Sequence, residues 1–178
     1  MPTDAMAKVR ELIVYLASRS AEDDHFGRTK LAKLLFFCDF GAVEELGAPI
    51  TGARYRKKER GPLAEEELLA LRDLRDSGSI DIEQVNVYGR TQKHIIARRE
   101  ADISWLTPAQ HVLIDEVVAR HWDDDAKRLS DLSHEFPGWE VADMDDVIPY
   151  HAVFIARQAP TQADIDWAEG VARELELV

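Results

Sequence analysis

The chain has 178 residues and a formal net charge of −12, and 46% of its residues are hydrophobic. This balance is typical of a soluble globular domain, and a chain of this length can bury a stable core without a disulfide or a metal. The single cysteine, Cys38, excludes an internal disulfide. No apolar run approaches the roughly 18 residues of a membrane span, and the N-terminus lacks the pattern of a secretion signal. We therefore expect one cytoplasmic domain over residues 1–178.

The charge is distributed unevenly along the chain. Residues 1–60 contain 11 Lys and Arg against 9 Asp and Glu, whereas residues 61–178 contain 11 against 25. The acidic second part argues against broad nucleic-acid binding, because neutralising phosphates requires clustered cations. The stretch "ARYRKKERG" is an exception, with five basic residues from Arg54 to Arg60.

Hydrophobic spacing predicts helices in the first half of the chain. "AKVRELIVYLAS" has apolar residues at i, i+3, i+4 and i+7, the pattern of an amphipathic helix. "TKLAKLLFFCDFGAVEEL" is apolar around most of its circumference and predicts the central buried helix. A loop with a short extended piece at residues 53–57 should follow. Gly61-Pro62 then predicts a helix that begins at Pro62 and ends near Asp76.

The second half predicts one hairpin and further helices. Alternating apolar residues over 80–99 predict two strands joined near residues 88–92. Thr107, Pro108 and Gln110 form a capping box that opens a helix. Further helices are expected over 126–136, 145–156 and 161–177. The predicted fold is mainly α, a compact bundle of about six or seven helices with one inserted β-hairpin, about residues 80–99.

The stretch "LSDLSHEFPGWE" contains the residue types of a hydrolase active site: two serines, a histidine and acidic residues. Ser130 and His134 lie four residues apart on the predicted helix, hence on one face. A serine nucleophile would also need an oxyanion hole and a residue that orients the imidazole, and neither is visible. We interpret the stretch as a helix end, where His134 serves free carbonyls and Trp139 folds back as a hydrophobic closure.

Other motifs of catalysis are missing from the sequence. There is no H-E-x-x-H, no zinc-binding cysteine pair and no glycine-rich phosphate loop. We therefore predict no enzyme activity, no catalytic or metal-ligating residues and no cofactor. A metal or enzyme site built around His134 is kept as a third, minor hypothesis.

The basic patch has two interpretations. It is either a solvated loop whose cations pair with acids of the same chain, or a docking site for an acidic protein surface or a phosphate backbone. In an extended segment, Arg54 and Arg56 would share one side. The predicted partner-binding residues are Arg54, Tyr55, Arg56, Lys57, Lys58 and Arg60.

Three sequence blocks occur in a fixed order along the chain. The first is "KLAKLLFFCDF", the second is the Gly-Pro before an acidic helix, and the third is "LSDLSHEFPGW". Together these blocks resemble the Panacea antitoxin domain, the SocA-like or phage-associated GepA-like family, from about Val9 to Trp139. The chain differs from the family pattern at Leu63, where valine is frequent, and at Phe36-Phe37, where a Tyr-Phe pair is frequent. Residues 140–178 form a C-terminal extension. The signature residues are Lys30, Lys33, Gly61, Pro62, Ser130, His134 and Trp139.

The resemblance implies a bacterial or phage antitoxin that neutralises a cognate toxin by direct contact. In the SocA-like case it also implies an adaptor that delivers the toxin to an AAA+ protease. The resemblance gives the signature residues no catalytic role, so we expect them to be structural. The alternative is a transcriptional regulator of a phage or toxin–antitoxin operon, which would bind nucleic acid through the Arg54–Arg60 patch. The sequence does not predict an oligomeric state.

Overall fold

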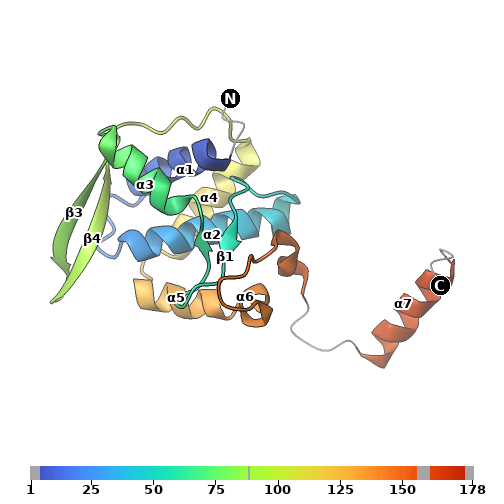
Figure 1. The fold of residues 1–178 in the computed structure, drawn as a ribbon. Coiled ribbons are helices and arrows are strands. Elements are labelled where there is room, and N and C mark those ends of the chain that lie inside the picture. The colour runs from blue at the N-terminus through green and yellow to red at the C-terminus, as the bar shows by residue number, and fades with distance from the viewer. Residues whose placement is uncertain (1–4, 88, 156–160, 175–178) are drawn as a thin grey trace.

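The computed structural model describes residues 5–87, 89–155 and 161–174, and it is mainly α-helical (Figure 1). Helix α2 runs through the middle of the body, and α1, α4 and α5 pack around it. Two small antiparallel sheets complete the described fold, where one hairpin was predicted. The first helices and the first sheet are α1 (Ala5–Arg19), α2 (Arg28–Leu46), β1 (Tyr55–Arg56) and β2 (Leu63–Ala64).

Helix α2 is the centre of the core, as its sequence predicts. Its buried side chains occupy every side of the helix, including Leu34, Leu35 and Cys38 at 0% exposure. Phe36 and Phe40 extend the core into an aromatic cluster with Tyr55, Phe136 and Tyr150. Because an all-round apolar helix must be covered on all sides, the other elements are arranged around it.

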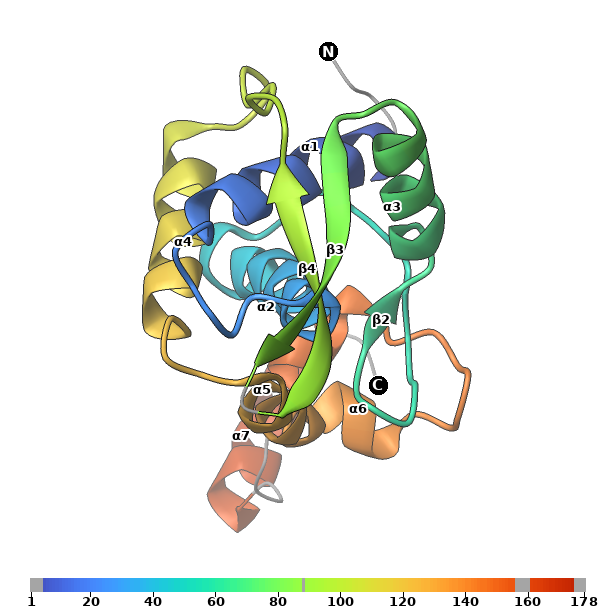
Figure 2. The same cartoon turned by 90° about the vertical axis from the view of Figure 1, so that its left-hand side faces the viewer.

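The predicted hairpin is confirmed as β3 (Ile80–Val87) and β4 (Arg90–Ala97), with Ile80 paired to Ala97 at its base. Figure 2 shows it crossing the molecule beside α1 and the start of α2. Ile80 and Ile95 are buried, and a bridge joins His94 to Gly27, the residue before α2. Helix α3 (Glu67–Asp76) packs against both α1 and β3. The hairpin is therefore fixed beside the first turn of α2.

The prediction that a helix begins at Pro62 is wrong. Leu63 and Ala64 form a strand that pairs with the extended piece at Arg56 and Tyr55, and α3 begins only at Glu67. The reason is the turn before it: Gly61 has φ +101°, so the chain turns back toward β1 instead of entering a helix. This turn produces the second sheet, which the sequence did not predict.

The C-terminal part contains shorter helices than predicted. The capping box of Thr107 and Gln110 is confirmed. Residues 145–156 do not form one helix: Asp145 has φ 69°, Pro149 precedes a 3-10 helix, η1, and residue 156 lies outside the described residues. The remaining elements are α4 (Pro108–Arg120), α5 (Ala126–His134), α6 (Pro137–Val141), η1 (Tyr150–Phe154) and α7 (Gln162–Glu174).

Helix α7 lies apart from the body in Figure 1. It confirms the predicted C-terminal helix, although residues 175–177 of that prediction lie outside the described residues. Whether residues 1–178 form one domain stays a prediction. Among the described helices, none is long and apolar enough to cross a membrane.

Candidate functional site

The three signature blocks meet at the loop of residues 57–62. Lys33 of α2 is only 3% exposed, and its Nζ donates to the carbonyl oxygen of Pro62 at 3.2 Å. A Cβ at Gly61 would overlap Ser133 Oγ and lie 2.5 Å from Lys33 Nζ. Only glycine therefore lets this loop approach both helices. We call this contact region the signature junction: Lys33, Gly61, Pro62, Ser133, His134 and Trp139.

Ser133, rather than Ser130, is the serine of the signature junction. Ser133 is fully buried and donates its hydroxyl hydrogen to the Ser130 carbonyl at 2.8 Å. Ser130 is partly exposed on the same helix. Sequence reasoning missed Ser133, although Leu129 and Ser133 have the i, i+4 spacing of one buried face of α5.

His134 and Trp139 pack together at the end of α5. That His134 serves the free carbonyls of this helix stays a prediction. Their rings stack with centroids 4.0 Å apart and an interplanar angle of 16°. Trp139 Nε1 donates to the carbonyl of Lys58 at 3.2 Å, and Lys57 Nζ lies 4.3 Å from the Trp139 ring centroid. This arrangement fixes the loop of residues 57–62 to α6.

His134 is partly buried, and its ring packs on Trp139. Its Nε2 is buried without a hydrogen-bond partner in the described chain. Burial lowers the pKa of His134 and the charge of Lys33 lowers it further, whereas the charge of Asp131 opposes the change. Among the described residues, no hydrogen bond joins the side chains of Ser130 and His134 of α5.

Lys30 holds together the neighbouring helix ends. Its buried Nζ forms an ion pair with Asp23 at 2.7 Å and donates to the carbonyls of Trp122 and Asp124 at 2.8 and 2.7 Å. The ammonium group of Lys30 therefore has two hydrogen-bond acceptors and one ion-pair partner. Lys30 connects the loop before α2 to the turn after α4.

A buried group of opposite charges lies beside the signature junction. Glu67 is 1% exposed, forms an ion pair with Arg28 at 3.3 Å, and leaves its Oε2 without a described partner. Burial raises the pKa of Glu67, while the Arg28 charge opposes that rise. Burial lowers the pKa of Lys33 to about 8, and the Glu67 charge partly offsets the effect. Part of the Lys33 population is thus neutral slightly above physiological pH.

Most side chains of the predicted basic patch form ion pairs or hydrogen bonds with other residues of the protein. Tyr55 is 1% exposed and donates to Asp39 at 2.9 Å, so it is not a surface contact. The other pairs join Arg56 and Arg54 to Glu65, Lys58 to Asp145 and Lys57 to the carbonyl of Ala142. These contacts favour the interpretation of a loop that pairs with its own acids. The remaining residue, Arg60, is exposed.

A cavity of about 1070 Å³ opens between the start of α2, the loop of residues 57–62, the hairpin and the start of α5. Although the protein is acidic, seven of the side chains that line it are basic and three are acidic. The basic residues are Arg28, Lys30, Lys33, Lys58, Arg60, Lys93 and Lys127, and the acidic ones are Glu59, Glu67 and Asp125. We call it the α2 cavity.

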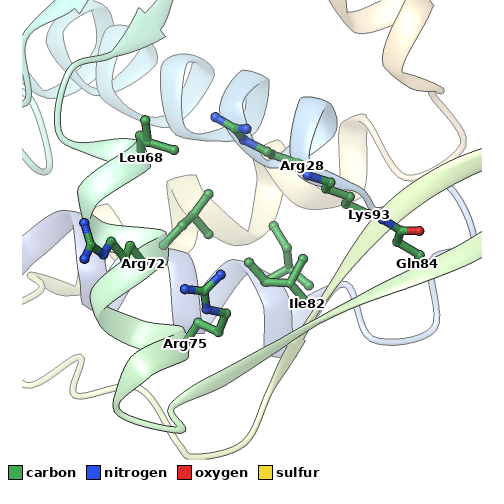
Figure 3. A pocket seen from close by; sticks show the side chains of 9 residues that line it. Arg28, Leu68, Arg72, Arg75, Ile82, Gln84 and Lys93 are labelled. Carbon is green, nitrogen blue, oxygen red and sulfur yellow. The ribbon is translucent and has the colours of Figure 1, made fainter.

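A smaller pocket of about 400 Å³ lies between α3 and the hairpin and shares Arg28 and Lys93 with the α2 cavity (Figure 3). No acidic residue lines it. Its apolar lining comes from Leu68, Leu71, Ile82 and Ile95, and Arg72, Arg75 and Gln84 complete it. Sequence reasoning missed both hollows, because their residues come from separate elements.

The family model described as antitoxin SocA-like, Panacea domain, matches residues 31–140. The chain belongs to the SocA-like Panacea antitoxin family. The match includes all of the predicted Panacea signature residues except Lys30, which immediately precedes it. No curated protein and no solved structure matches the chain.

The signature junction brings the three Panacea blocks of this chain into contact. Each block contributes a surface that the others cover: α2 with Lys33, the turn at Gly61, and the α5–α6 segment with Ser133 and Trp139. Within the described residues no cluster of three or more His, Cys, Asp or Glu could hold a metal.

Proposed function

We propose that the chain is an antitoxin-type binding protein that neutralises a cognate toxin by direct contact and has no catalytic activity. The family match over residues 31–140 is the observation that carries this proposal. The burial of four signature residues, Lys30, Lys33, Gly61 and Pro62, supports it, because buried residues that hold a loop in place shape a surface and are not free to react.

The surface that best fits a protein partner lies at the C-terminal end. Phe154 is 68% exposed, Val141 69% and Trp167 of α7 71%. These side chains come from two parts of the C-terminal region: the segment of α6 and η1, which pack on each other, and α7, which lies apart from the body. Exposed apolar side chains mark interaction sites, and aromatic residues dominate binding energies. The whole set, which we call the C-terminal apolar surface, is Val141, Met144, Val147, Phe154, Ile155, Ile165 and Trp167.

The charges around this surface indicate the chemistry of the partner. Glu140, Asp143, Asp145 and Asp146 lie within the same segment, and all four are exposed. Asp145 is paired with Lys58, whereas the other three acids have no ion pair among the described residues. Such acids around apolar contacts would attract a cationic toxin and determine its orientation. We therefore place the toxin contact at the C-terminal apolar surface. Contact through Arg54, Lys58 and Arg60 of the basic patch stays a prediction.

Delivery of the bound toxin to an AAA+ protease is a second step of the same proposal. It rests on the family resemblance, and it requires that the toxin be bound first. Toxin half-life in cells tests it: we expect a shorter half-life when the chain is co-expressed, and recovery when the protease is deleted. An unchanged half-life would leave neutralisation by contact and remove the adaptor role.

Co-expression with the product of the adjacent gene tests the proposal. We expect that product to arrest growth alone and wild-type chain to restore growth. A Phe154→Ser, Trp167→Ser variant should lose rescue while remaining folded, because both side chains are exposed. Val112→Ser is the matched control, since Val112 is 55% exposed on α4, outside the surface. The proposal would be overturned if the product of the adjacent gene did not arrest growth when expressed alone and formed no complex with the chain.

The second candidate is a nucleic-acid-binding regulator of the operon. The cation-lined α2 cavity favours it, whereas the net charge of −12 opposes it. A gel shift with the upstream DNA at low salt decides it. Retardation that disappears with rising salt would support it, and free DNA at every protein concentration would remove it.

A further inference from the structure

We infer that the α2 cavity binds a small phosphorylated ligand of the nucleoside polyphosphate class, with its phosphates at the first turn of α2. The inference is independent of the proposed function. The hairpin that borders the cavity and the helix α7 that carries Trp167 lie at opposite ends of the molecule in Figure 1. A ligand in the cavity therefore leaves the C-terminal apolar surface free.

The first argument is the balance of charge inside the cavity. Four of its seven cations have acidic partners in the chain: Lys30 with Asp23, Arg28 with Glu67, Lys58 with Asp145 and Lys127 with Asp131. Lys33, Arg60 and Lys93 have no ion pair among the described residues. Two lining acids, Glu59 and Asp125, also have no ion pair among the described residues, so the unpaired side chains leave an excess of one positive charge. In a protein with a net charge of −12, a hollow with a positive excess favours an anion.

The second argument is the helix that opens into the cavity. Helix α2 has 19 residues, and no side chain caps its N-terminus at Gly27. The N–H groups of a first helical turn have no intrahelical acceptors, and the helix dipole places positive charge there. Thr29 and Lys30 of this turn line the cavity. Such a turn binds phosphate oxygens through its amides.

The third argument is Lys33, one turn further along the same helix. Lys33 and Thr29 are four residues apart and therefore on one face. The side chain of Lys33 is only 3% exposed and lines the cavity, yet its ammonium has a single described acceptor, the carbonyl of Pro62. An ammonium has three hydrogens to donate, so two are available to a ligand oxygen. A buried lysine with spare donors beside a helix start can hold a phosphate.

The size of the hollow indicates more than inorganic phosphate. At about 1070 Å³ it matches the upper range of small-molecule sites, whose volumes are about 300–1,000 Å³. The adjoining pocket in Figure 3 adds an apolar wall from Leu68, Leu71 and Ile82, with Arg72 and Arg75 near its edge. Arginine planes stack on aromatic rings, so this pocket suits the base of a nucleotide.

Calorimetric titration of the full chain tests the inference, with pyrophosphate, ATP and a 12-nucleotide single-stranded DNA at constant ionic strength. We expect ATP and pyrophosphate to bind. The dissociation constant for ATP should rise at least tenfold in an Arg60→Ser, Lys93→Ser variant. Arg120→Ser, which removes an exposed cation of α4 outside the cavity, should bind ATP as wild type does.

Proton uptake gives a readout specific to Lys33. At pH 8.5 part of the Lys33 population is neutral, and a bound phosphate would draw it to the charged form. ATP binding should then take up a fraction of a proton, measured in buffers of different ionisation enthalpy, and Lys33→Met should abolish this uptake. Failure of both phosphate probes to bind would overturn the inference. The inference would also be overturned if only the oligonucleotide bound, or if Arg120→Ser weakened ATP binding as much as the Arg60→Ser, Lys93→Ser variant does.

Discussion

Lys33 and Pro62 are joined by a hydrogen bond of 3.2 Å from the lysine Nζ to the proline carbonyl, in a site that water barely reaches. This bond links the central helix to the loop that precedes β2. Gly61 lies directly beside it, against Ser133 of α5. One turn of backbone thus holds together three segments that are far apart in the sequence.

Substitution of Gly61 by alanine should destabilise the fold strongly. Alanine would have to adopt φ near +101° and would overlap Ser133 Oγ and Lys33 Nζ. Strain and overpacking together should lower the free energy of unfolding by about 2–5 kcal/mol, measured by urea denaturation. Gly52→Ala is the matched control, because Gly52 has φ +74° with nothing within 4 Å. It should cost about 1 kcal/mol. Equal costs would contradict the packing role of Gly61.

Lys33 should make the stability of the protein depend on alkaline pH. Its pKa is lowered from 10.5 to about 8 in the folded chain. Between these values the unfolded chain binds more protons than the folded one, so stability should rise with pH. Relative to Lys33→Met, the wild type should gain up to about 3 kcal/mol from pH 8 to pH 10.5, measured by chemical denaturation. Lys93→Met, which removes an exposed amine, is the control. Parallel curves for wild type and Lys33→Met would refute this account of Lys33.

Removal of the ring of Trp139 should weaken the end of α5. Trp139→Ala loses the stack on His134 and the hydrogen bond to Lys58, and we expect a loss of about 3 kcal/mol in thermal unfolding. His134→Ala should cost about 1–3 kcal/mol. Trp167→Ala serves as the control, because its side chain is 71% exposed and should change stability by less than about 0.5 kcal/mol. Unchanged unfolding of Trp139→Ala would show that the closure of α5 is not structural.

Asp39 should be a major polar anchor of the core. Its carboxylate is fully buried and accepts from the Thr51 amide at 2.6 Å and from the Tyr55 hydroxyl at 2.9 Å. Asp39→Ala would leave these two buried donors without an acceptor. The free energy of unfolding should therefore fall by about 2–4 kcal/mol in urea denaturation. The exposed pair of Asp131 and Lys127 gives a comparison, and Asp131→Ala should cost under about 1 kcal/mol. A comparable loss in both variants would argue against an anchoring role for Asp39.

Local patterns predicted the elements of this fold well. The apolar circumference of α2, the alternation in β3 and β4 and the capping box at Thr107 are signals within one segment, and each is confirmed. Gly61-Pro62 misled the prediction because a glycine followed by proline precedes both helices and turns. The deciding contacts, from Lys33 and Ser133, come from other segments.

The candidate sites were less predictable for the same reason. Tyr55 lies among cations in the sequence, but its side chain turns into the core toward Asp39. The α2 cavity depends on Arg28, Arg60 and Lys93, which only the fold brings together. The distribution of charge along the sequence therefore predicted the basic loop. It could not predict which cations remain without an ion pair, because that depends on the tertiary structure.

Direct titration of the purified chain with the product of the adjacent gene tests the central claim, that this antitoxin-family protein binds its toxin through the C-terminal apolar surface. The account predicts a stable complex with wild type and with Val112→Ser. It predicts at least a tenfold rise in the dissociation constant for the folded Phe154→Ser, Trp167→Ser variant. A complex of unchanged affinity with that variant, or no complex with wild type, would contradict it.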